Sequence, residues 1–228
     1  MTPATATASG SPMQPPVVQP AVVPPVVLEG RHIRLEPLTL GHARALVEVA
    51  NGPRESYGFT LVPADETSML RYIEAALRDQ EAGRALPFAT VAKATGRVVG
   101  STRFGNIEFW AWPPDNPHQR GPDVPDVAEI GWTWLAADAQ RTPINTEAKL
   151  LMLTHAFETW RVHRVSLMTD ARNERSRRAI LRVGAQFDGV IRAQRMAFDG
   201  TIRDTAAFSI LESEWPTVKR QLQSRMDH

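Results

Sequence analysis

The chain has 228 residues, of which 43% are hydrophobic and 22% are charged, and its formal net charge is +1. These values suit one soluble domain with a full-sized core, and they give no general attraction to nucleic acid or to a membrane surface. The absence of cysteine excludes disulfides, thiolate metal sites and a cysteine nucleophile. Because neither a secretory signal nor an apolar run of ~20 residues is visible, we expect a cytoplasmic protein without a membrane span.

Residues 1–25 contain mainly Pro, Ala, Thr, Ser, Gln and Val. Frequent prolines interrupt any hydrogen-bonded ladder, and the segment has too little apolar surface to offset the entropy lost on ordering. We therefore expect a disordered tail over 1–25 and one folded domain over 26–228.

The first half of the predicted domain alternates between short strands and helices. Apolar periodicity and turn residues predict, in chain order, a strand over Val27–Pro37, helices over Leu40–Asn51 and Glu66–Ala82, and strands over Phe88–Lys93 and Val98–Phe104. An irregular insertion follows over 108–126, with five prolines and three aromatic residues. Loops of this length in compact domains are usually functional or disordered.

The second half contains the longest helix. The pattern predicts a strand over Val127–Leu135, a buried helix over Ile144–Trp160, a strand over Arg164–Thr169, a helix over Asn173–Val183, strands over Gln186–Ala197 and Ile202–Ile210, and a terminal helix over Glu212–Met226. Adjacent strands favour antiparallel pairing at both ends of the sheet, and the strand–helix–strand unit in the middle favours one parallel crossover. The fold class is therefore a mixed α/β sheet in one layered domain.

Two junctions between a strand and a helix carry polar residues. In the first, Arg141 precedes Thr142, which suits a helix cap, and Pro143 suits the first helical position. In the second, Asn173 suits a cap and is followed by several arginines. Helix starts at the ends of neighbouring parallel strands form a crevice suited to a phosphate-bearing ligand. The alternatives are ordinary capped helices and arginines on a solvated face.

Several segments, in chain order, resemble the GNAT acetyltransferases, and within them the RimJ/RimL-like branch. The segments are Ala128–Trp132, Gln140–Lys149, Arg172–Ser176 and Glu214–Pro216. The resemblance covers roughly residues 26–215. It implies the GNAT fold and an acyl-CoA-dependent N-acyltransferase in which acetyl-CoA is the co-substrate. The acceptor would be a primary amine, on a protein N-terminus or a small molecule, that attacks directly in a ternary complex.

The resemblance also implies a set of contacts with acyl-CoA. Gln140 matches the first position of the family's pyrophosphate signature, whereas Pro143 and Asn145 occupy positions where glycine is usual. The implied partners of the co-substrate are Gln140, Arg141, Thr142, Ile144, Asn145 and Thr146 at the pyrophosphate, the backbone near Trp134 and Leu135 along the pantetheine, and the Asn173 side chain. Because Pro143 has no N–H group, one possible donor to the pyrophosphate is lost.

Two residues are candidates for catalytic roles. Ser176 occupies the position where the RimJ/RimL-like branch places a serine near the sulfur, which implies a hydrogen bond to the leaving thiolate. Glu129 is the candidate base, alone or through water; the alternative is a surface glutamate on a strand. A backbone N–H group of the central strand would polarise the thioester carbonyl. Tyr57 and Tyr72, the two tyrosines, lie outside the helix where many GNAT enzymes place one.

Several alternatives stay open. The chain could be a GNAT-fold module that binds acyl-CoA without transferring the acyl group. The 108–126 insertion could cover the acceptor site, pack on the domain surface or contact a second subunit of a homodimer. His155 and His163 have no carboxylate at ligand spacing, so we expect no metal site. A nucleotide-binding α/β domain is excluded, because neither Gly-rich phosphate motif is present.

Overall fold

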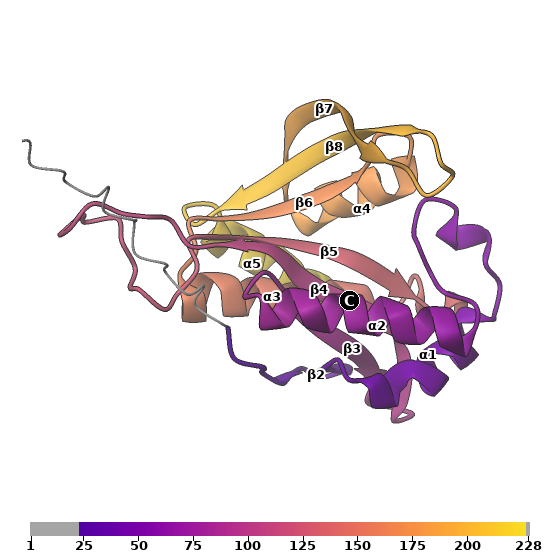
Figure 1. Cartoon of the computed structure of the whole chain (residues 1–228). Helices are drawn as coiled ribbons and strands as arrows, with labels where there is room; N and C mark the ends of the chain where they lie inside the picture. The colour runs from indigo at the N-terminus through magenta and orange to yellow at the C-terminus, as the bar shows by residue number, and fades with distance from the viewer. Residues whose placement is uncertain (1–22, 227–228) are drawn as a thin grey trace, which may run out of the picture.

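The computed structural model describes residues 23–226. Its eight strands form one sheet in the order β1-β2-β3-β4-β5-β6-β8-β7 (Figure 1). The pairing of β5 with β6 is parallel, and every other pair of neighbours is antiparallel. The mixed sheet with one parallel crossover is therefore confirmed.

The N-terminal half follows the predicted order, with one interruption. Its elements are β1 (Leu28–Glu29), β2 (Ile33–Pro37), a 3-10 turn (Leu40–His42), α1 (Ala43–Ala50), a 3-10 turn (Glu55–Tyr57), α2 (Glu66–Glu81), β3 (Leu86–Ala92) and β4 (Arg97–Glu108). The strand predicted over 27–37 is split because its middle residues turn toward α3. There the buried Glu147 carboxylate accepts hydrogen bonds from the backbone N–H groups of Arg31, His32 and Ile33, at 2.6 to 2.9 Å.

The C-terminal half contains β5 (Val127–Leu135), a 3-10 turn (Ala137–Ala139), α3 (Pro143–Thr154), a π-helical turn (His155–Trp160), β6 (Arg164–Asp170), α4 (Glu174–Val183), β7 (Gln186–Met196), β8 (Ile202–Leu211) and α5 (Trp215–Met226). The predicted long helix thus ends in a π-helical turn. A π turn inserts one extra residue per turn. This wider turn places the Trp160 ring 4.6 Å from Phe104 and 4.7 Å from His155, measured between ring centroids.

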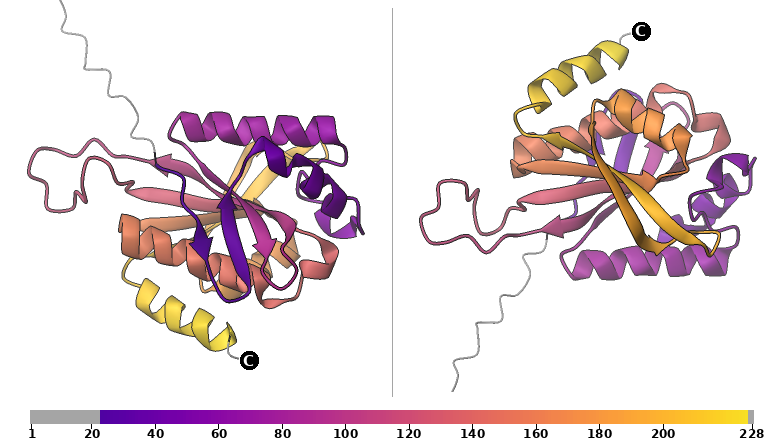
Figure 2. Two further views of the ribbon diagram at one scale, coloured as in Figure 1. Left: turned by 90° about the horizontal axis from the view of Figure 1, so that it is seen from below. Right: turned by 90° about the horizontal axis from the view of Figure 1, so that it is seen from above.

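Helices cover both faces of the sheet. Helices α1 and α2 pack on one face over β3, β4 and the end of β5, around Leu46, Met69 and Ile73. Helices α3, α4 and α5 pack on the other face, where Met152, Ile180 and Leu222 belong to a second core cluster. Figure 2 shows α2 on one side of the sheet, with α3 and α5 on the opposite side. We call the first of these the α2 face of the sheet and the second the α3 face.

The predicted tail, 1–25, lies mostly outside the described residues. Val23, however, is only 3% exposed and belongs to the core cluster on the α3 face. The folded domain therefore includes at least Val23, three residues before the predicted boundary. Within the described part of the chain, no helix combines the length and apolar character needed to cross a membrane.

Candidate functional site

Strands β5 and β6 are paired over only part of their length. Their paired positions are Val127 with Arg164, Ala128 with Val165, and Glu129 with Ser166. Beyond Glu129 the two strands run apart (Figure 1), and we call the stretches 130–135 and 167–170 the β5–β6 divergence. The backbone groups of β5 that face β6 there lack a strand partner, so they can pair with an extended ligand.

The start of α3 lies at the end of β5. The Thr142 hydroxyl accepts a hydrogen bond from the Ile144 N–H group at 3.3 Å, and Pro143 fills the first helical position. Both features were predicted. Because the first N–H groups of a helix have no partner within it, those of Thr142 and Asn145 can bind an anion. Arg141 precedes the cap in the left-handed conformation, with φ of 60°, and its side chain is exposed.

The start of α4 lies at the end of β6. Asn173 caps this helix, because its side-chain oxygen accepts a hydrogen bond from the Ser176 N–H group at 3.0 Å. The side-chain amide of Asn173 is not used by the cap, so it can donate to a ligand. Ser176 is half-buried in the first turn of α4. The two predicted helix starts thus follow the two parallel strands that diverge.

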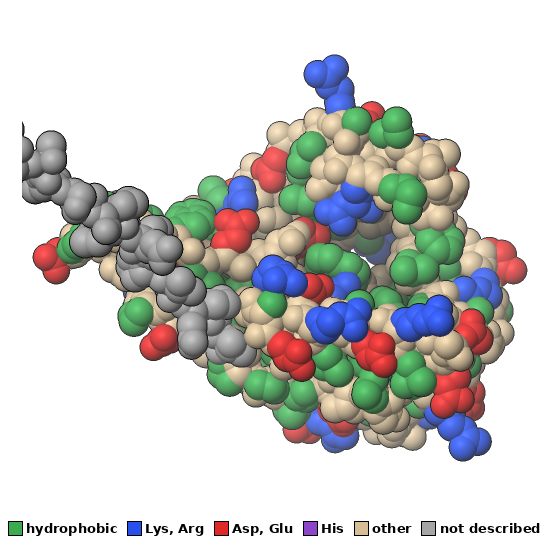
Figure 3. Space-filling view, in the orientation of Figure 1, with side chains coloured by type: hydrophobic (Ala, Val, Ile, Leu, Met, Phe, Trp, Pro, Cys, Tyr) green, Lys and Arg blue, Asp and Glu red, His purple; other side chains and the backbone are tan. Residues whose placement is uncertain are grey.

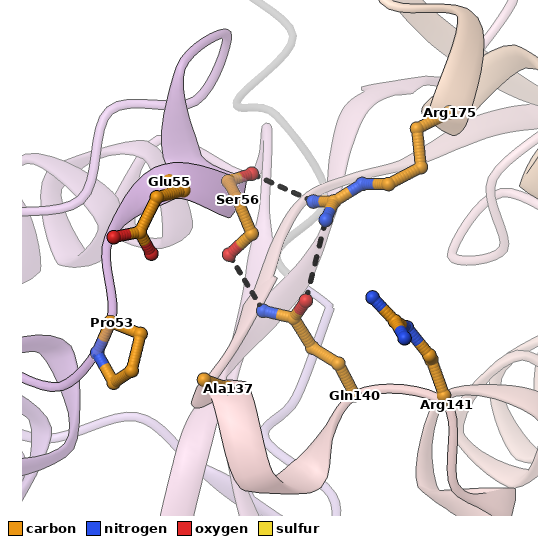
Figure 4. Close-up of a pocket in the computed structure, with 7 residues that line it drawn as sticks. All are labelled: Pro53, Glu55, Ser56, Ala137, Gln140, Arg141 and Arg175. Atoms are coloured by element: carbon orange, nitrogen blue, oxygen red, sulfur yellow. Dashed lines mark hydrogen bonds between the residues drawn. The ribbon is translucent and has the colours of Figure 1, made fainter.

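A pocket of about 480 Å³ lies beside these helix starts, and we call it the Gln140 pocket. The Gln140 amide donates to the Leu135 carbonyl at 2.8 Å and to the Ser56 hydroxyl at 2.9 Å. Arg175 donates to the Ser56 carbonyl at 2.7 Å and to the Gln140 side-chain oxygen at 3.4 Å. Arg141 lines the same pocket, which therefore brings two guanidinium groups together (Figure 4).

Four further residues expected to contact acyl-CoA lie outside the lining of this pocket. The Trp134 side chain is buried on the α2 face with Tyr57 edge-on at 6.1 Å between ring centroids. The Tyr57 hydroxyl donates to the Leu135 carbonyl at 3.0 Å. Ile144 is half-buried and packs against both core clusters. Thr146 is half-buried in the first turn of α3.

Glu129 lies at the last paired position of β5 and is 6% exposed. Its carboxylate accepts a hydrogen bond from the Asn106 amide at 2.7 Å. Burial raises the pKa of Glu129, while the Asn106 hydrogen bond and the charges of Arg195 and Arg203 act in the opposite direction. The alternative interpretation, an exposed glutamate on a strand, is therefore wrong. A buried carboxyl with a raised pKa suits proton transfer.

A second pocket, of about 520 Å³, lies on the α2 face between α2 and the β4–β5 pair. We call it the Trp132 pocket. Trp132 has φ of 50° and lies at an irregularity in the β4–β5 register. Its ring contacts the Arg103 guanidinium at 4.0 Å. Gly105 allows this position of the ring, because a Cβ atom there would lie 2.3 Å from the Trp132 ring.

The structure also assigns site residues that the sequence did not single out. Arg175 belongs to a run of arginines that is also typical of a solvated helix face, so only its contacts with Ser56 and Gln140 distinguish it. Asn106 and Arg103 approach Glu129 and Trp132 across the β4–β5 pair, where the register is irregular. The sequence carries no local signal for that irregularity apart from Gly105 and Gly131.

The 108–126 insertion does not cover either pocket. Figure 1 shows it projecting from the end of the sheet where β5 and β6 are paired, away from the divergence. The buried Asp126 carboxylate accepts hydrogen bonds from the Trp110 N–H group at 2.6 Å and the Trp112 indole at 2.7 Å. The Trp110 ring stacks on His163 at 5.8 Å. These contacts and this direction do not support the lid interpretation. They fit the alternative in which the aromatic residues pack on the domain surface or against a second subunit.

A family model described as an acetyltransferase (GNAT) domain matches residues 32–186. A GCN5-related N-acetyltransferase from Brucella melitensis is 29% identical in sequence, with a TM-score of 0.75 over 90% of this chain and 86% of its own. The structure of Mycobacterium smegmatis RimJ in complex with CoA-disulfide is 23% identical, with a TM-score of 0.67 over 90% of this chain and 93% of its own. At that identity RimJ shows the shared fold alone.

A Bacillus subtilis (strain 168) protein, provisionally named ribosomal N-acetyltransferase YdaF, is 33% identical over 92 residues, which is 40% of this chain. The chain spans about half of that curated relative, because the match covers 49% of its length. The family model confirms the expected likeness to the GNAT acetyltransferases. The matched residues 32–186 include the β5–β6 divergence and both helix starts. The chain belongs to the GNAT family of acetyltransferases.

Proposed function

We propose that the chain transfers an acetyl group from acetyl-CoA to a primary amine, in a ternary complex of the protein with both substrates. The observation that carries this proposal is the β5–β6 divergence, flanked by two capped helix starts and by the guanidinium groups of Arg141 and Arg175. Unpaired backbone groups along an extended strand suit the amide-rich pantetheine, and a cationic pocket at a helix start suits the phosphates.

Each end of acetyl-CoA has a matching set of residues. Arg141, Arg175 and the N–H groups of Thr142 and Asn145 hold the pyrophosphate, while Gln140 fixes the loop by bonding the Leu135 carbonyl. Arg175 reaches the phosphates by exchanging its bond to Ser56, a neutral acceptor, for a charged one. The backbone of 130–135 pairs with the pantetheine, and the Asn173 amide adds one side-chain donor. Pro143 contributes conformation alone, because it has no N–H group.

The proton transfers are assigned to two side chains. Glu129 accepts a proton from the acceptor ammonium, directly or through one water, and its raised pKa makes its carboxylate a stronger base than that of an exposed glutamate. The amine nitrogen then attacks the thioester carbon, and a β5 backbone N–H group stabilises the oxyanion. As the N–C bond forms and the C–S bond breaks, the second proton of the amine passes to the leaving sulfur, and the Ser176 hydroxyl donates a hydrogen bond to that sulfur.

The competing function is an acyl-CoA-binding module that no longer transfers the acyl group. Two observations favour it: Pro143 removes one donor at the start of α3, and α4 carries Ser176 rather than a tyrosine in its first turn. Both functions predict binding of acetyl-CoA, so binding alone does not separate them.

Release of the coenzyme A thiol separates the two functions. We expect wild-type protein to release coenzyme A from acetyl-CoA in an amine-dependent reaction when a panel of primary amines is supplied. Asn173→Ala should weaken acetyl-CoA binding, whereas Ser176→Ala should lower turnover and leave binding almost unchanged, because it acts mainly in the transition state. Calorimetric binding of acetyl-CoA without release of coenzyme A, under every amine of the panel, would establish the binding module.

A further inference from the structure

Arg103 is a buried cation with unused hydrogen-bond donors. Its residue is 8% exposed, and its guanidinium lies over the Trp132 ring at 4.0 Å. The nearest carboxylate is that of Asp79, 3.6 Å from the Arg103 Nη1 atom, and Asp79 is shared with Arg84 at 2.8 Å. Among the described residues, the buried Nε atom of Arg103 has no hydrogen-bond partner. A buried guanidinium is costly unless an anion engages its donors.

The surroundings of Arg103 provide room for such an anion. Arg103 and Trp132 line the Trp132 pocket, and Arg71 of α2 adds a second guanidinium. Leu61 and Pro63, from the segment before α2, add apolar surface. A guanidinium stacked on an aromatic ring keeps its edge free, and that edge matches a carboxylate through two parallel hydrogen bonds. Burial also removes water from the Arg103 guanidinium, and this desolvation lowers its pKa.

The register of β4 and β5 relates this pocket to the proposed base. Arg103 pairs with Gly131, and Gly105 pairs with Glu129. Arg103 and Glu129 are therefore diagonal neighbours on the α2 face, with roughly 7–8 Å between such positions. A small molecule can then place its amine at Glu129 and its anionic group at Arg103. In the described part of the chain, this pocket shares no lining residue with the Gln140 pocket, where the phosphates of acetyl-CoA are proposed to bind.

The surface view agrees with this arrangement. Figure 3 shows the molecule hollowed between α2 and the β7–β8 hairpin, with Lys and Arg side chains around the hollow. Arg195 of β7 and Arg203 of β8 are close enough to lower the pKa of Glu129. The approach to Glu129 therefore carries an excess of positive charge, which attracts an acceptor with an anionic group and disfavours a polycationic one.

We propose that Arg103, in the Trp132 pocket, binds a carboxylate of the amine acceptor. The acceptor class is then the free amino acids and similar small amino-carboxylates, rather than the N-terminus of a protein, whose first carbonyl is an uncharged amide. The apolar part of the pocket, at Leu61 and Pro63, receives the acceptor's side chain. This inference rests on the proposed function for the fate of the amine, but the binding of the carboxylate can be tested separately.

The kinetic test compares L-amino acids with their carboxamides as acceptors of the acetyl group. The two have the same amine and side chain, and the carboxamide loses its ammonium proton more readily, so amine chemistry alone favours the carboxamide. We expect kcat/KM to be at least 10-fold higher for the amino acids. Arg103→Met should raise KM for the amino acids about 10- to 100-fold and leave the carboxamides almost unchanged, because a charge-assisted pair is lost.

Two further variants serve as controls. Arg103→Lys keeps the positive charge, so it should retain part of the preference and shows whether loss of activity reflects misfolding. Arg78→Met removes an exposed arginine of α2 that does not line the pocket, and it should leave both acceptor series unchanged. Equal kcat/KM for amino acids and carboxamides, with no selective effect of Arg103→Met, would overturn the inference while leaving the acetyltransferase function intact.

A binding measurement separates this inference from the proposed function. The same amino acids are titrated into protein saturated with coenzyme A, where no transfer can occur. Binding that depends on Arg103, without acetylation in the kinetic assay, supports the carboxylate site and contradicts the function. An absence of binding for every amino acid overturns the inference. A second experiment compares acetyl-CoA with succinyl-CoA as the acyl donor. If Arg103→Met lowers activity only with succinyl-CoA, whichever amine is used, Arg103 binds the carboxylate of the succinyl group instead.

Discussion

Glu129 is the proposed base, and burial sets the direction of its pKa shift. Because burial raises its pKa, the ionised form gains population as pH rises through a range closer to neutrality than for an exposed glutamate. Wild-type kcat should therefore rise with pH in the acidic range and then level off. We predict that Glu129→Gln lowers kcat about 10²- to 10⁴-fold and flattens this rise. The measurement is kcat from pH 5 to 9, and an unchanged profile would mean that solvent accepts the proton.

Lys149 is a buried amine that has no carboxylate partner within residues 23–226. It lies on α3, its Nζ atom is 2.7 Å from the Thr133 hydroxyl, and desolvation lowers its pKa from 10.5 to about 7. Folding therefore disfavours the protonated form. The resulting cost is fully present below about pH 7 and decreases as pH rises toward the unfolded pKa. Thr102 and Thr133 bond each other at 2.8 Å, so they stay paired without Lys149.

We predict that Lys149→Met stabilises the fold, by about 2–5 kcal/mol at pH 6 and by less at pH 9.5, because the desolvation cost is removed. Urea unfolding of both proteins at the two pH values measures this difference. A stability gap of the same size at both pH values would show that Lys149 stays protonated in the folded protein.

Some site residues could be predicted from the sequence because their roles are local. Thr142 and Asn173 cap helices through contacts with residues two and three positions away, and such contacts leave a sequence pattern. The roles of Arg103 and Arg175 could not be predicted from the sequence, because the residues that they contact lie on other elements. Glu147 stands within the predicted phosphate segment, but its carboxylate binds the backbone of 31–33 instead.

Helix α4 offers a matched pair of arginines that tests the Gln140 pocket. Arg175 lines the pocket, whereas Arg178, on the same helix, is exposed and pairs with Glu174 at 3.5 Å. We predict that Arg175→Ala weakens acetyl-CoA binding about 10- to 100-fold, since a charge-assisted bond to phosphate is lost. Arg178→Ala should bind like the wild type in calorimetric titrations. Equal affinities of the wild type and both variants for acetyl-CoA would show that the phosphates do not bind in this pocket.

The projecting part of the 108–126 insertion should be dispensable for transfer. Replacement of 113–123 by a short Gly-Ser linker keeps the hydrogen bonds of Trp110 and Trp112 to Asp126. This segment projects from the end of the sheet opposite the β5–β6 divergence (Figure 1), and none of its residues lines either pocket. We therefore predict unchanged KM values for acetyl-CoA and for the amine. A raised KM for the amine alone would restore the lid that the sequence had suggested.

Element boundaries were predictable where a cap or a turn marks them. Strand β5 was predicted at its observed limits. For β6, α2 and α4, the predicted and observed ranges differ by one residue. The sequence could not show where β5 and β6 separate, because β5 continues with apolar residues after Glu129 and β6 continues with apolar residues after Ser166. The π-helical turn at 155–160 was also missed, because its wider spacing serves the packing of Trp160 against Phe104.

At the scale of the molecule, two pockets with different lining residues lie near β5. The Gln140 pocket lies near the starts of α3 and α4, and the Trp132 pocket lies between α2 and the β4–β5 pair. Glu129 lies beside the second site at the point where the strands part. The order of the predicted elements was enough to predict the topology of the sheet. The sequence did not predict that the folded domain includes Val23, because the residues around Val23 have the same composition as the tail before them.

Amide hydrogen exchange of the whole chain, with and without acetyl-CoA, locates the site most directly. Binding should slow exchange at 130–135, at the α3 start over 141–146 and at the α4 start over 173–177, because those amides donate to the ligand or lose contact with water. Exchange in 109–126 should not change. Protection confined to other segments, or none at millimolar acetyl-CoA, would contradict a donor site at the β5–β6 divergence.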